Sequence, residues 1–153
     1  LFKMKTIIVT GSVCSGKTTL ARLLAKKYHA IYIDVNDLIK QYKLYSGYDK
    51  KMKSYIVNIN RLNKFLIKLI KSSKNNLILD SHLTRYLPSK YVDLCYVTKC
   101  NLKTLKKRLE KRRYSKEKVR ENLDAEILDV CLTEALENKH KVKVIDTTNG
   151  IEF

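Results

Sequence analysis

Hydrophobic residues recur along the chain with two different periods, which predict alternating strands and helices. Short apolar runs, rich in β-branched residues and typical of buried strands, lie at 6–10, 31–34, 76–80, 94–98 and 142–146. Helical spacing of three and four positions marks a segment that begins after Gly16, and then 36–45, 58–72, 101–111 and 115–138. This alternation predicts an α/β fold with a parallel sheet.

The length and composition favour one folded domain. The chain has 153 residues, 44% of them hydrophobic and 31% charged, without an internal repeat or a linker. We therefore expect residues 1–153 to form one domain. Ser46–Asp49 has the residue types of a turn. No apolar run approaches the roughly 20 residues that a membrane span needs, so no membrane association is expected.

The cysteines indicate a reducing compartment. Cys14, Cys95, Cys100 and Cys131 form no Cys-x-x-Cys pair and no metal-ligand cluster with the three histidines. Neither a disulfide framework nor a structural zinc site is expected. We interpret the four as reduced, mostly buried side chains of a cytoplasmic protein, which would also be nuclear in a eukaryote.

Positive charge is the most unusual feature of the composition. The chain has 32 Lys and Arg against 15 Asp and Glu, a formal net charge of +17. Eleven of the basic residues fall between Lys99 and Glu121, among three glutamates. Such a run is either a solvated helical face or a surface for an anionic partner such as a nucleotide or RNA. Composition leaves both readings open.

A glycine-rich segment carries the strongest functional signal. Gly11–Thr18 reads Gly-Ser-Val-Cys-Ser-Gly-Lys-Thr, follows a predicted strand and precedes a predicted helix. This is the phosphate-loop pattern, in which backbone N–H groups and the start of the helix bind phosphate oxygens. Lys17 is predicted to bridge the β- and γ-phosphates of a nucleotide, and the Thr18 hydroxyl to bind Mg²⁺.

Two further candidates lie at the end of the predicted strand at 76–80 and just after it. Asp80 ends this apolar run, where a carboxylate beside a phosphate loop holds Mg²⁺ or its waters. The alternative is an ordinary aspartate that caps a turn. His82 lies two residues later and is a candidate for the same crevice, although a lone histidine is often structural.

Two aspartates follow the second predicted strand, where kinases with a phosphate loop have their acceptor site. Asp37 is a candidate for orienting an acceptor, and Asp34 for a base or a contact to the magnesium shell. Either is equally suited to cap the following helix.

Together these segments resemble the family of adenylate kinase isoenzyme 6, also known as the coilin-interacting nuclear ATPase type, and its archaeal counterparts. The likeness runs from Ile7 to about Leu136. Beyond the phosphate loop, the segments that carry it are Asp37-Leu38, Leu44–Asp49, Asp80-Ser81-His82, Pro88, Arg108–Glu110, Arg112–Tyr114, Glu121-Asn122 and Glu126-Ile127.

The resemblance implies a nucleoside-monophosphate-kinase-like P-loop fold with five parallel strands, an acceptor-binding segment at about 35–72 and a short lid at about 108–118. It implies ATP, Mg²⁺ and AMP as ligands, with Arg108 near the transferred phosphoryl group and Arg112 on the adenine or phosphates. The residues that it assigns to the ATP phosphates are Gly11, Ser12, Val13, Cys14, Ser15, Gly16, Lys17, Thr18 and Thr19.

Lys40 departs from the family pattern, because an arginine usually follows Asp-Leu-x in the acceptor segment. A lysine keeps the positive charge but cannot form the bidentate hydrogen bonds that a guanidinium makes to a phosphate. The resemblance thus predicts an ATP:AMP phosphotransferase with associated ATPase activity, linked to small ribosomal subunit maturation through a platform ribosomal protein and pre-rRNA. The alternatives are an assembly ATPase with little AMP kinase activity, and a kinase for another small acceptor.

Overall fold

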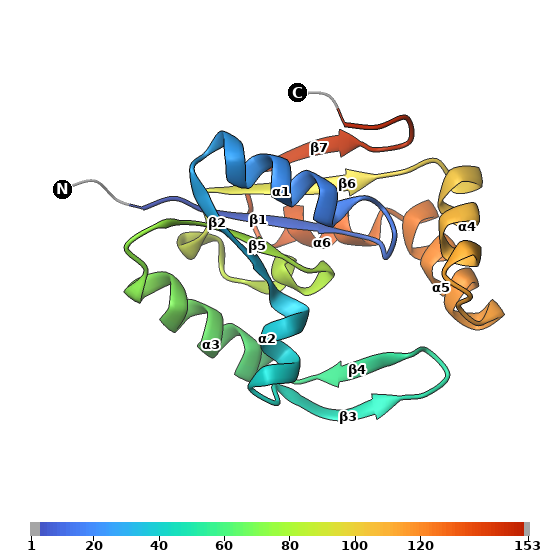
Figure 1. Cartoon of the computed structure of the whole chain (residues 1–153), viewed down its shortest axis with the longest axis horizontal. Helices are drawn as coiled ribbons and strands as arrows, with labels where there is room; N and C mark the ends of the chain where they lie inside the picture. Colours follow the sequence, from blue (N-terminus) through green and yellow to red (C-terminus); the bar gives the residue numbers. More distant parts are fainter. Residues whose placement is uncertain (1–3, 152–153) are drawn as a thin grey trace.

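The computed structural model describes residues 4–151, and its centre is a five-stranded parallel sheet (Figure 1). The strands are β1 (Thr6–Gly11), β2 (Ala30–Asp34), β5 (Asn76–Asp80), β6 (Leu94–Lys99) and β7 (Val142–Asp146), in the order β2-β5-β1-β6-β7. Every neighbouring pair is parallel. The predicted α/β fold with five parallel strands is confirmed.

Helices cover both faces of the sheet, because alternate residues of the central strand point to opposite sides. Ile7 and Val9 pack with α1 (Lys17–Lys27), whereas Ile8 packs with α2 (Val35–Gln41), α3 (Ile59–Ser72) and α6 (Val130–Glu137). All three strand residues are fully buried. The run Ile-Ile-Val is therefore apolar without alternation, as expected for a strand covered on both faces.

The segment predicted as a turn at Ser46–Asp49 is instead a strand, so that prediction is wrong. β3 (Tyr45–Asp49) pairs antiparallel with β4 (Ser54–Val57) in a separate two-stranded hairpin (Figure 1). The rings of Tyr45 and Tyr55 lie 4.4 Å apart across the pair. Cross-strand aromatic contact of this kind stabilises a hairpin whose own residues favour turns.

The predicted helix at 115–138 is two helices, α5 (Lys116–Ile127) and α6, and the helical conformation is interrupted between them at Asp129. Asp129 has a left-handed backbone with φ of 52°, which aspartate tolerates better than most residues. Its carboxylate forms an ion pair with Lys99, which also binds the carboxylate of Glu126 at 2.6 Å. The break thus places two acids around one lysine.

The chain continues from β5 through two short 3₁₀ helices at His82–Tyr86 and Ser89–Tyr91, and from β6 into α4 (Leu102–Lys111). The helices α4 and α5 form a helical hairpin with its own small core, which includes Leu105, Leu109 and Val119. Residues of the phosphate loop pack against that core. The helical hairpin is therefore attached to the loop that it is expected to cover.

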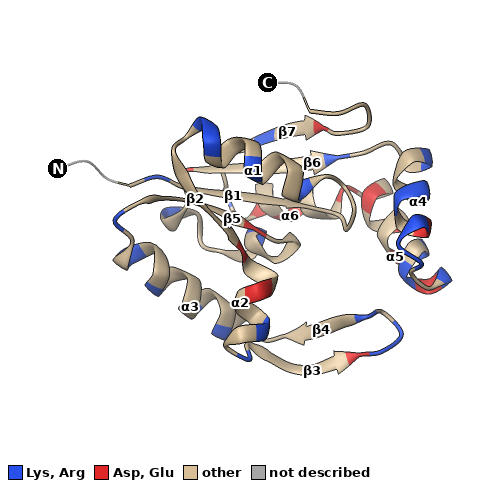
Figure 2. Cartoon of the chain, in the orientation of Figure 1, with Lys and Arg blue, Asp and Glu red and all other residues tan. Residues whose placement is uncertain are grey.

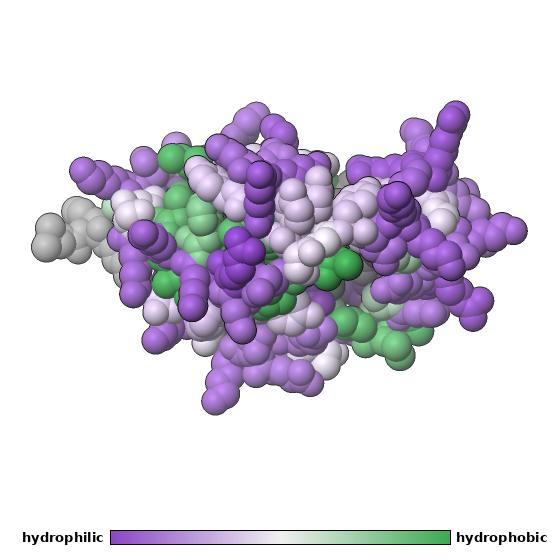
Figure 3. Space-filling view, turned by 90° about the horizontal axis from the view of Figure 1, so that it is seen from below, coloured by the Kyte–Doolittle hydropathy of each residue, from purple (hydrophilic) through white to green (hydrophobic). Residues whose placement is uncertain are grey.

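Lysines and arginines spread over the helical hairpin, α3 and the tip of the β3–β4 hairpin (Figure 2). Viewed from the side of the β3–β4 hairpin, the surface is mostly hydrophilic, with hydrophobic residues in small separate patches (Figure 3). No helix among residues 4–151 combines the length and the apolar character that crossing a membrane requires. All four cysteines are free, and Cys95 and Cys100 are buried.

Buried His140 predicts a specific dependence of stability on pH. Burial lowers the pKa of His140 below its ordinary 6.5, although its hydrogen bond to the carbonyl of Arg85 opposes the shift. Below pH 6.5 His140 therefore binds a proton in the unfolded chain but not in the folded one. The free energy of unfolding falls as the pH falls. We expect His140→Gln to flatten this slope by up to about 1.4 kcal/mol per pH unit. Urea unfolding between pH 4 and 8 measures it, and parallel curves for both proteins would contradict the assignment.

Candidate active site

The phosphate loop connects β1 to α1 at the carboxyl edge of the sheet, where ligands of parallel α/β folds bind. Gly16 has a φ of 91° and precedes α1 without a side-chain cap. The first N–H groups of α1 therefore have no partner within the helix or from a capping side chain. An uncapped helix start of this kind suits an anion.

The loop residues divide into a lining set and a supporting set around a large cleft. Val13, Cys14, Gly16, Lys17, Thr18 and Thr19 line the cleft. Gly11, Ser12 and Ser15 are buried behind them. The hydroxyl of Ser15 donates to the carbonyl of Ser12 and is bonded to the hydroxyl of Thr98 at 2.6 Å. This buried network holds the curve of the loop.

Lys17 lies folded over the loop with its ammonium in the cleft. Its Nζ donates to the carbonyl of Ser12 at 2.8 Å. Burial lowers the pKa of Lys17, and the charge of Asp80 opposes that shift. A cation kept in a poorly solvated place is ready to exchange a backbone carbonyl for a phosphate oxygen.

Asp80 is buried at the end of β5 and receives two hydroxyl groups on one oxygen. Its Oδ2 accepts from Thr18 Oγ1 at 3.0 Å and from the Tyr32 hydroxyl at 2.8 Å. Thr18 and Asp80 are therefore in contact, and their expected part in holding Mg²⁺ remains a prediction. Tyr32 adds a contact that sequence reasoning missed. One hydroxyl and one carboxylate fit Mg²⁺, which usually takes few protein ligands and completes its shell with phosphates and water.

His82 opens the first 3₁₀ helix and lines the same cleft. Burial, together with the charges of Lys17, Arg85 and Lys118, lowers the pKa of His82 to about 3. The imidazole is therefore neutral near pH 7 and can donate or accept one hydrogen bond there. The part expected of His82 in positioning water or Asp80 remains a prediction.

The two candidate aspartates, one at the end of β2 and one in α2, have different surroundings. Asp34 accepts from the backbone N–H of Asn36 at 2.9 Å, so it caps α2, the alternative role foreseen for it. Burial, and then the charge of Asp37, raises the pKa of Asp34. Asp37 is exposed and does not line the cleft, whereas Lys40 does. The contacts expected of Asp37 and Lys40 with an acceptor remain predictions.

The cleft has a volume of about 1410 Å³ and joins the phosphate loop to the segments expected to bind the acceptor and to form the lid. The phosphate loop and Asp80 form one wall. The acceptor segment contributes Lys40 and the tyrosines of the β3–β4 hairpin, namely Tyr45, Tyr48 and Tyr55. The turn between α4 and α5 closes the remaining side. A volume of this size exceeds the usual range for one small ligand and suits two.

The two predicted lid arginines have different surroundings. Arg112 is exposed and lines the cleft beside Tyr114. The guanidinium of Arg108 donates to the carbonyl of Cys14 at 3.3 Å and to the carbonyl of Thr147 at 2.8 Å. Arg108 thus fastens the phosphate loop to the segment after β7. Its expected place near the transferred phosphoryl group remains a prediction.

Sequence reasoning did not single out Tyr32, which contacts Asp80, and it also passed over the lining residues Thr147, Lys53 and Lys118. Thr147 is buried, and its hydroxyl donates to the carbonyl of Ser15 at 2.6 Å. Lys53 lies at the tip of the β3–β4 hairpin, and Lys118 in the first turn of α5. The basic run between Lys99 and Glu121 includes Lys118, but the charge pattern alone does not separate it from its exposed neighbours.

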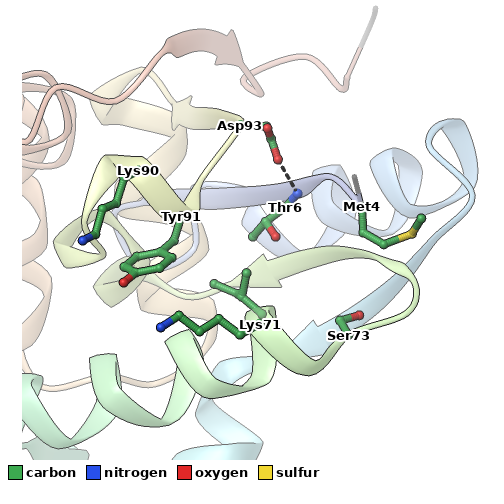
Figure 4. Close-up of a pocket in the computed structure, with 8 residues that line it drawn as sticks. Met4, Thr6, Lys71, Ser73, Lys90, Tyr91 and Asp93 are labelled. Carbon is green, nitrogen blue, oxygen red and sulfur yellow. Dashed lines mark hydrogen bonds between the residues drawn. The ribbon is translucent and has the colours of Figure 1, made fainter. Parts of the chain in front are cut away.

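A smaller hollow of about 320 Å³ lies near the amino end of β1, away from the phosphate loop (Figure 4). There the ring of Tyr91 lies 5.6 Å from Lys71 Nζ and 5.1 Å from Lys90 Nζ, and Asp93 accepts from the N–H of Thr6 at 2.7 Å. None of the predicted site residues lines this hollow. The larger cleft is therefore the candidate active site.

Comparisons with known proteins agree with this geometry. Residues 7–129 match the family model described as "AAA domain". The chain is 42% identical over 143 residues to "Putative adenylate kinase" of Methanocaldococcus jannaschii, which covers 94% of this chain and 77% of that protein. It is 32% identical over 140 residues to the adenylate kinase isoenzyme 6 homolog of Dictyostelium discoideum, with coverages of 91% and 78%.

Solved structures show the same fold. A shikimate kinase from Bacteroides thetaiotaomicron has a TM-score of 0.56 at 16% identity, covering 94% of this chain and 86% of that one. A sugar kinase from a Janibacter species has a TM-score of 0.61 at 17% identity, with coverages of 94% and 85%. The fold and the phosphate-loop site define a P-loop phosphotransferase. The curated relatives show, more narrowly, that the chain belongs to the adenylate kinase isoenzyme 6 family.

Proposed function

We propose that the protein is an adenylate kinase that transfers the γ-phosphoryl group of ATP to AMP, and that it hydrolyses ATP when the acceptor side is empty. One observation carries the proposal: the phosphate loop, the Thr18–Asp80 pair and the acceptor segment face one another across a single cleft. The names of the curated relatives support the nucleotide as substrate. The free cysteines fit the reducing cytoplasm.

The reaction needs positioning and charge stabilisation more than covalent chemistry by the protein. An oxygen of the AMP α-phosphate attacks the γ-phosphorus of ATP, the bond to the β-phosphate bridging oxygen breaks, and two ADP result. Lys17 and the first N–H groups of α1 balance the charge on the transferred oxygens. Thr18 and Asp80 would hold Mg²⁺, whose charge neutralises β- and γ-phosphate oxygens. The lid excludes water, and without AMP a water molecule takes the place of the acceptor.

Product analysis with labelled ATP and Mg²⁺, with and without AMP, tests the proposal. We expect ADP to form from AMP much faster than phosphate is released without AMP. If phosphate release prevails and AMP does not change it, the protein is an ATPase. If another monophosphate or a hydroxyl compound accepts the label better than AMP, the acceptor is different.

We expect Lys40→Arg to increase the affinity for the acceptor. Lys40 is exposed at the rim of the cleft and offers a single ammonium group to a phosphate. A guanidinium forms two parallel hydrogen bonds with a phosphate, so we expect the KM for AMP to fall about three- to tenfold while kcat stays similar. Steady-state kinetics at saturating ATP measure both constants, and Lys43→Arg nearby on an exposed position serves as control. An unchanged KM would mean that Lys40 does not bind the acceptor phosphate.

The second candidate function is a nucleotide-controlled assembly factor for the small ribosomal subunit, acting on a platform ribosomal protein and pre-rRNA. The observation that favours it is the exposed basic face of α4, which a small nucleotide does not require: Lys103, Lys106 and Lys107 are exposed there and lie outside the cleft. Binding to ribosomal RNA by phosphate contacts should weaken steeply with salt. A salt-independent interaction would contradict this form of the proposal.

A further inference from the structure

The tip of the β3–β4 hairpin touches the lid across the mouth of the cleft. The Ser115 hydroxyl, between α4 and α5, donates to the carbonyl of Lys51 at 3.1 Å. The two residues are separated by 64 positions in the chain. Figure 2 shows the basic tip of the hairpin beneath the basic end of the helical hairpin. Acceptor segment and lid thus meet at a place where both carry positive charge.

The side chain of Lys118 is mostly buried at this meeting point, and its ammonium reaches the cleft. Its residue is only 7% exposed, and it lines the cleft. Its Nζ lies 4.0 Å from the centre of the Tyr114 ring. Within residues 4–151, no carboxylate lies at ion-pair distance from it and no oxygen accepts its protons. An ammonium on a mostly buried side chain, facing a cleft and without a counter-charge in the protein, is suited to bind an anion there.

Two neighbouring cations also disfavour the charge on Lys118. Burial lowers the pKa of Lys118, and although Cys14 and Glu121 oppose the shift, the charges of Lys53 and Arg112 add to it. The same ammonium acts on His82, which Lys17 also approaches. Lys118 therefore shares one space with Lys17, and both residues line the cleft.

We propose that Lys53 and Lys118 form a second phosphate-binding subsite, opposite the phosphate loop, for the phosphate oxygens of the paired donor and acceptor nucleotides. The inference rests on the proposed kinase function. A bound phosphate supplies a negative counter-charge to the two lysines. By binding both of them, it holds the β3–β4 hairpin against the lid. Occupancy of both nucleotide sites then favours closure over water entry.

The subsite is tested by calorimetric binding of a bisubstrate compound, two adenosines joined by five phosphates, compared with ATP alone. We expect Lys118→Met to weaken the bisubstrate compound about tenfold and Lys53→Met about threefold, with smaller effects on ATP. Lys118→Arg should retain most of the affinity. Lys116→Met, on the same helix but exposed and outside the cleft, should change neither ligand.

Each outcome has one meaning. Unchanged bisubstrate affinity in both methionine variants overturns the subsite. Lys53 is exposed, so its variant carries the test even if Lys118→Met does not fold. If the unaltered protein binds the bisubstrate compound no better than ATP, AMP is not the acceptor and the proposed function fails. Inorganic tripolyphosphate, compared between the unaltered protein and both variants, then tests the subsite without an acceptor nucleoside, and equal affinity in all three overturns it.

Discussion

Replacing Lys17 with methionine is expected to lower kcat for phosphoryl transfer from ATP by about 10²- to 10³-fold, the usual effect of removing one preorganised charge donor. Lys17 is the loop cation that lies in the cleft, at the start of α1 and close enough to feel the charge of Asp80. No other residue of the phosphate loop carries a charge. Rates of ADP formation with and without AMP measure the effect.

Stability should not fall with activity in this variant. Burial of the Lys17 ammonium disfavours its charged form, and methionine removes that cost while taking one donor from the Ser12 carbonyl, which still accepts from Ser15. The two effects oppose each other, so we expect a melting temperature near that of the unaltered protein. Lys26→Met, an exposed position at the far end of α1, is the matched control and should retain full activity. Activity within threefold for Lys17→Met would remove the loop lysine from the reaction.

Local patterns predicted the sheet and the long helices well, because their burial is strong and regular. The apolar run before Gly11 is β1, and the segment at 142–146 is β7 with the same bounds. The stripe of hydrophobic residues at 58–72 became α3, with Asn58 as its capping residue. In these segments the residues that favour the element are also those that face the core.

The patterns were wrong where distant contacts decide the structure. Ser46–Asp49 has turn residues, but pairing with Ser54–Val57 and the contact between Tyr45 and Tyr55 make it a strand. The helix expected at 115–138 contains no glycine or proline to mark its break at Asp129. The ion pairs with Lys99, 30 positions earlier, stabilise the two separate helices, and no local pattern reports them.

The candidate site also contains some residues that the sequence could single out and others that it could not. The phosphate loop has a fixed residue pattern and Asp80 ends a buried strand, so both could be singled out as candidates from the sequence. Tyr32 reaches Asp80 because β2 pairs with β5, with Asp34 opposite Asp80 in the register. Lys53 and Lys118 come together only through the contact of the hairpin tip with the lid. Residues that act through closure of the fold cannot be separated from their neighbours by composition.

Gly11→Ala is expected to be the most damaging substitution for stability. Gly11 has a φ of 151°, and an added Cβ would lie 2.1 Å from Thr98 Oγ1 and 2.7 Å from Ser15 Oγ. Those two hydroxyls are buried and bonded to each other, so neither can move without breaking the network that holds the loop. Overpacking and backbone strain together should cost about 3 kcal/mol. The melting temperature should fall by roughly 10 °C.

Gly47→Ala is the matched control, since a Cβ there meets only Ile56 Cδ1 at 3.5 Å, an ordinary contact. We expect its free energy of unfolding to change by less than about 0.5 kcal/mol. Equal melting temperatures for the two variants would show that the phosphate loop relaxes around a methyl group. A large loss confined to Gly11→Ala, with weaker ATP binding at temperatures where the protein stays folded, would show that the buried hydroxyls of Ser15 and Thr98 set the shape of the loop. Catalysis by Lys17 and Thr18 depends on that shape, because both residues directly follow the curve that the hydroxyls hold.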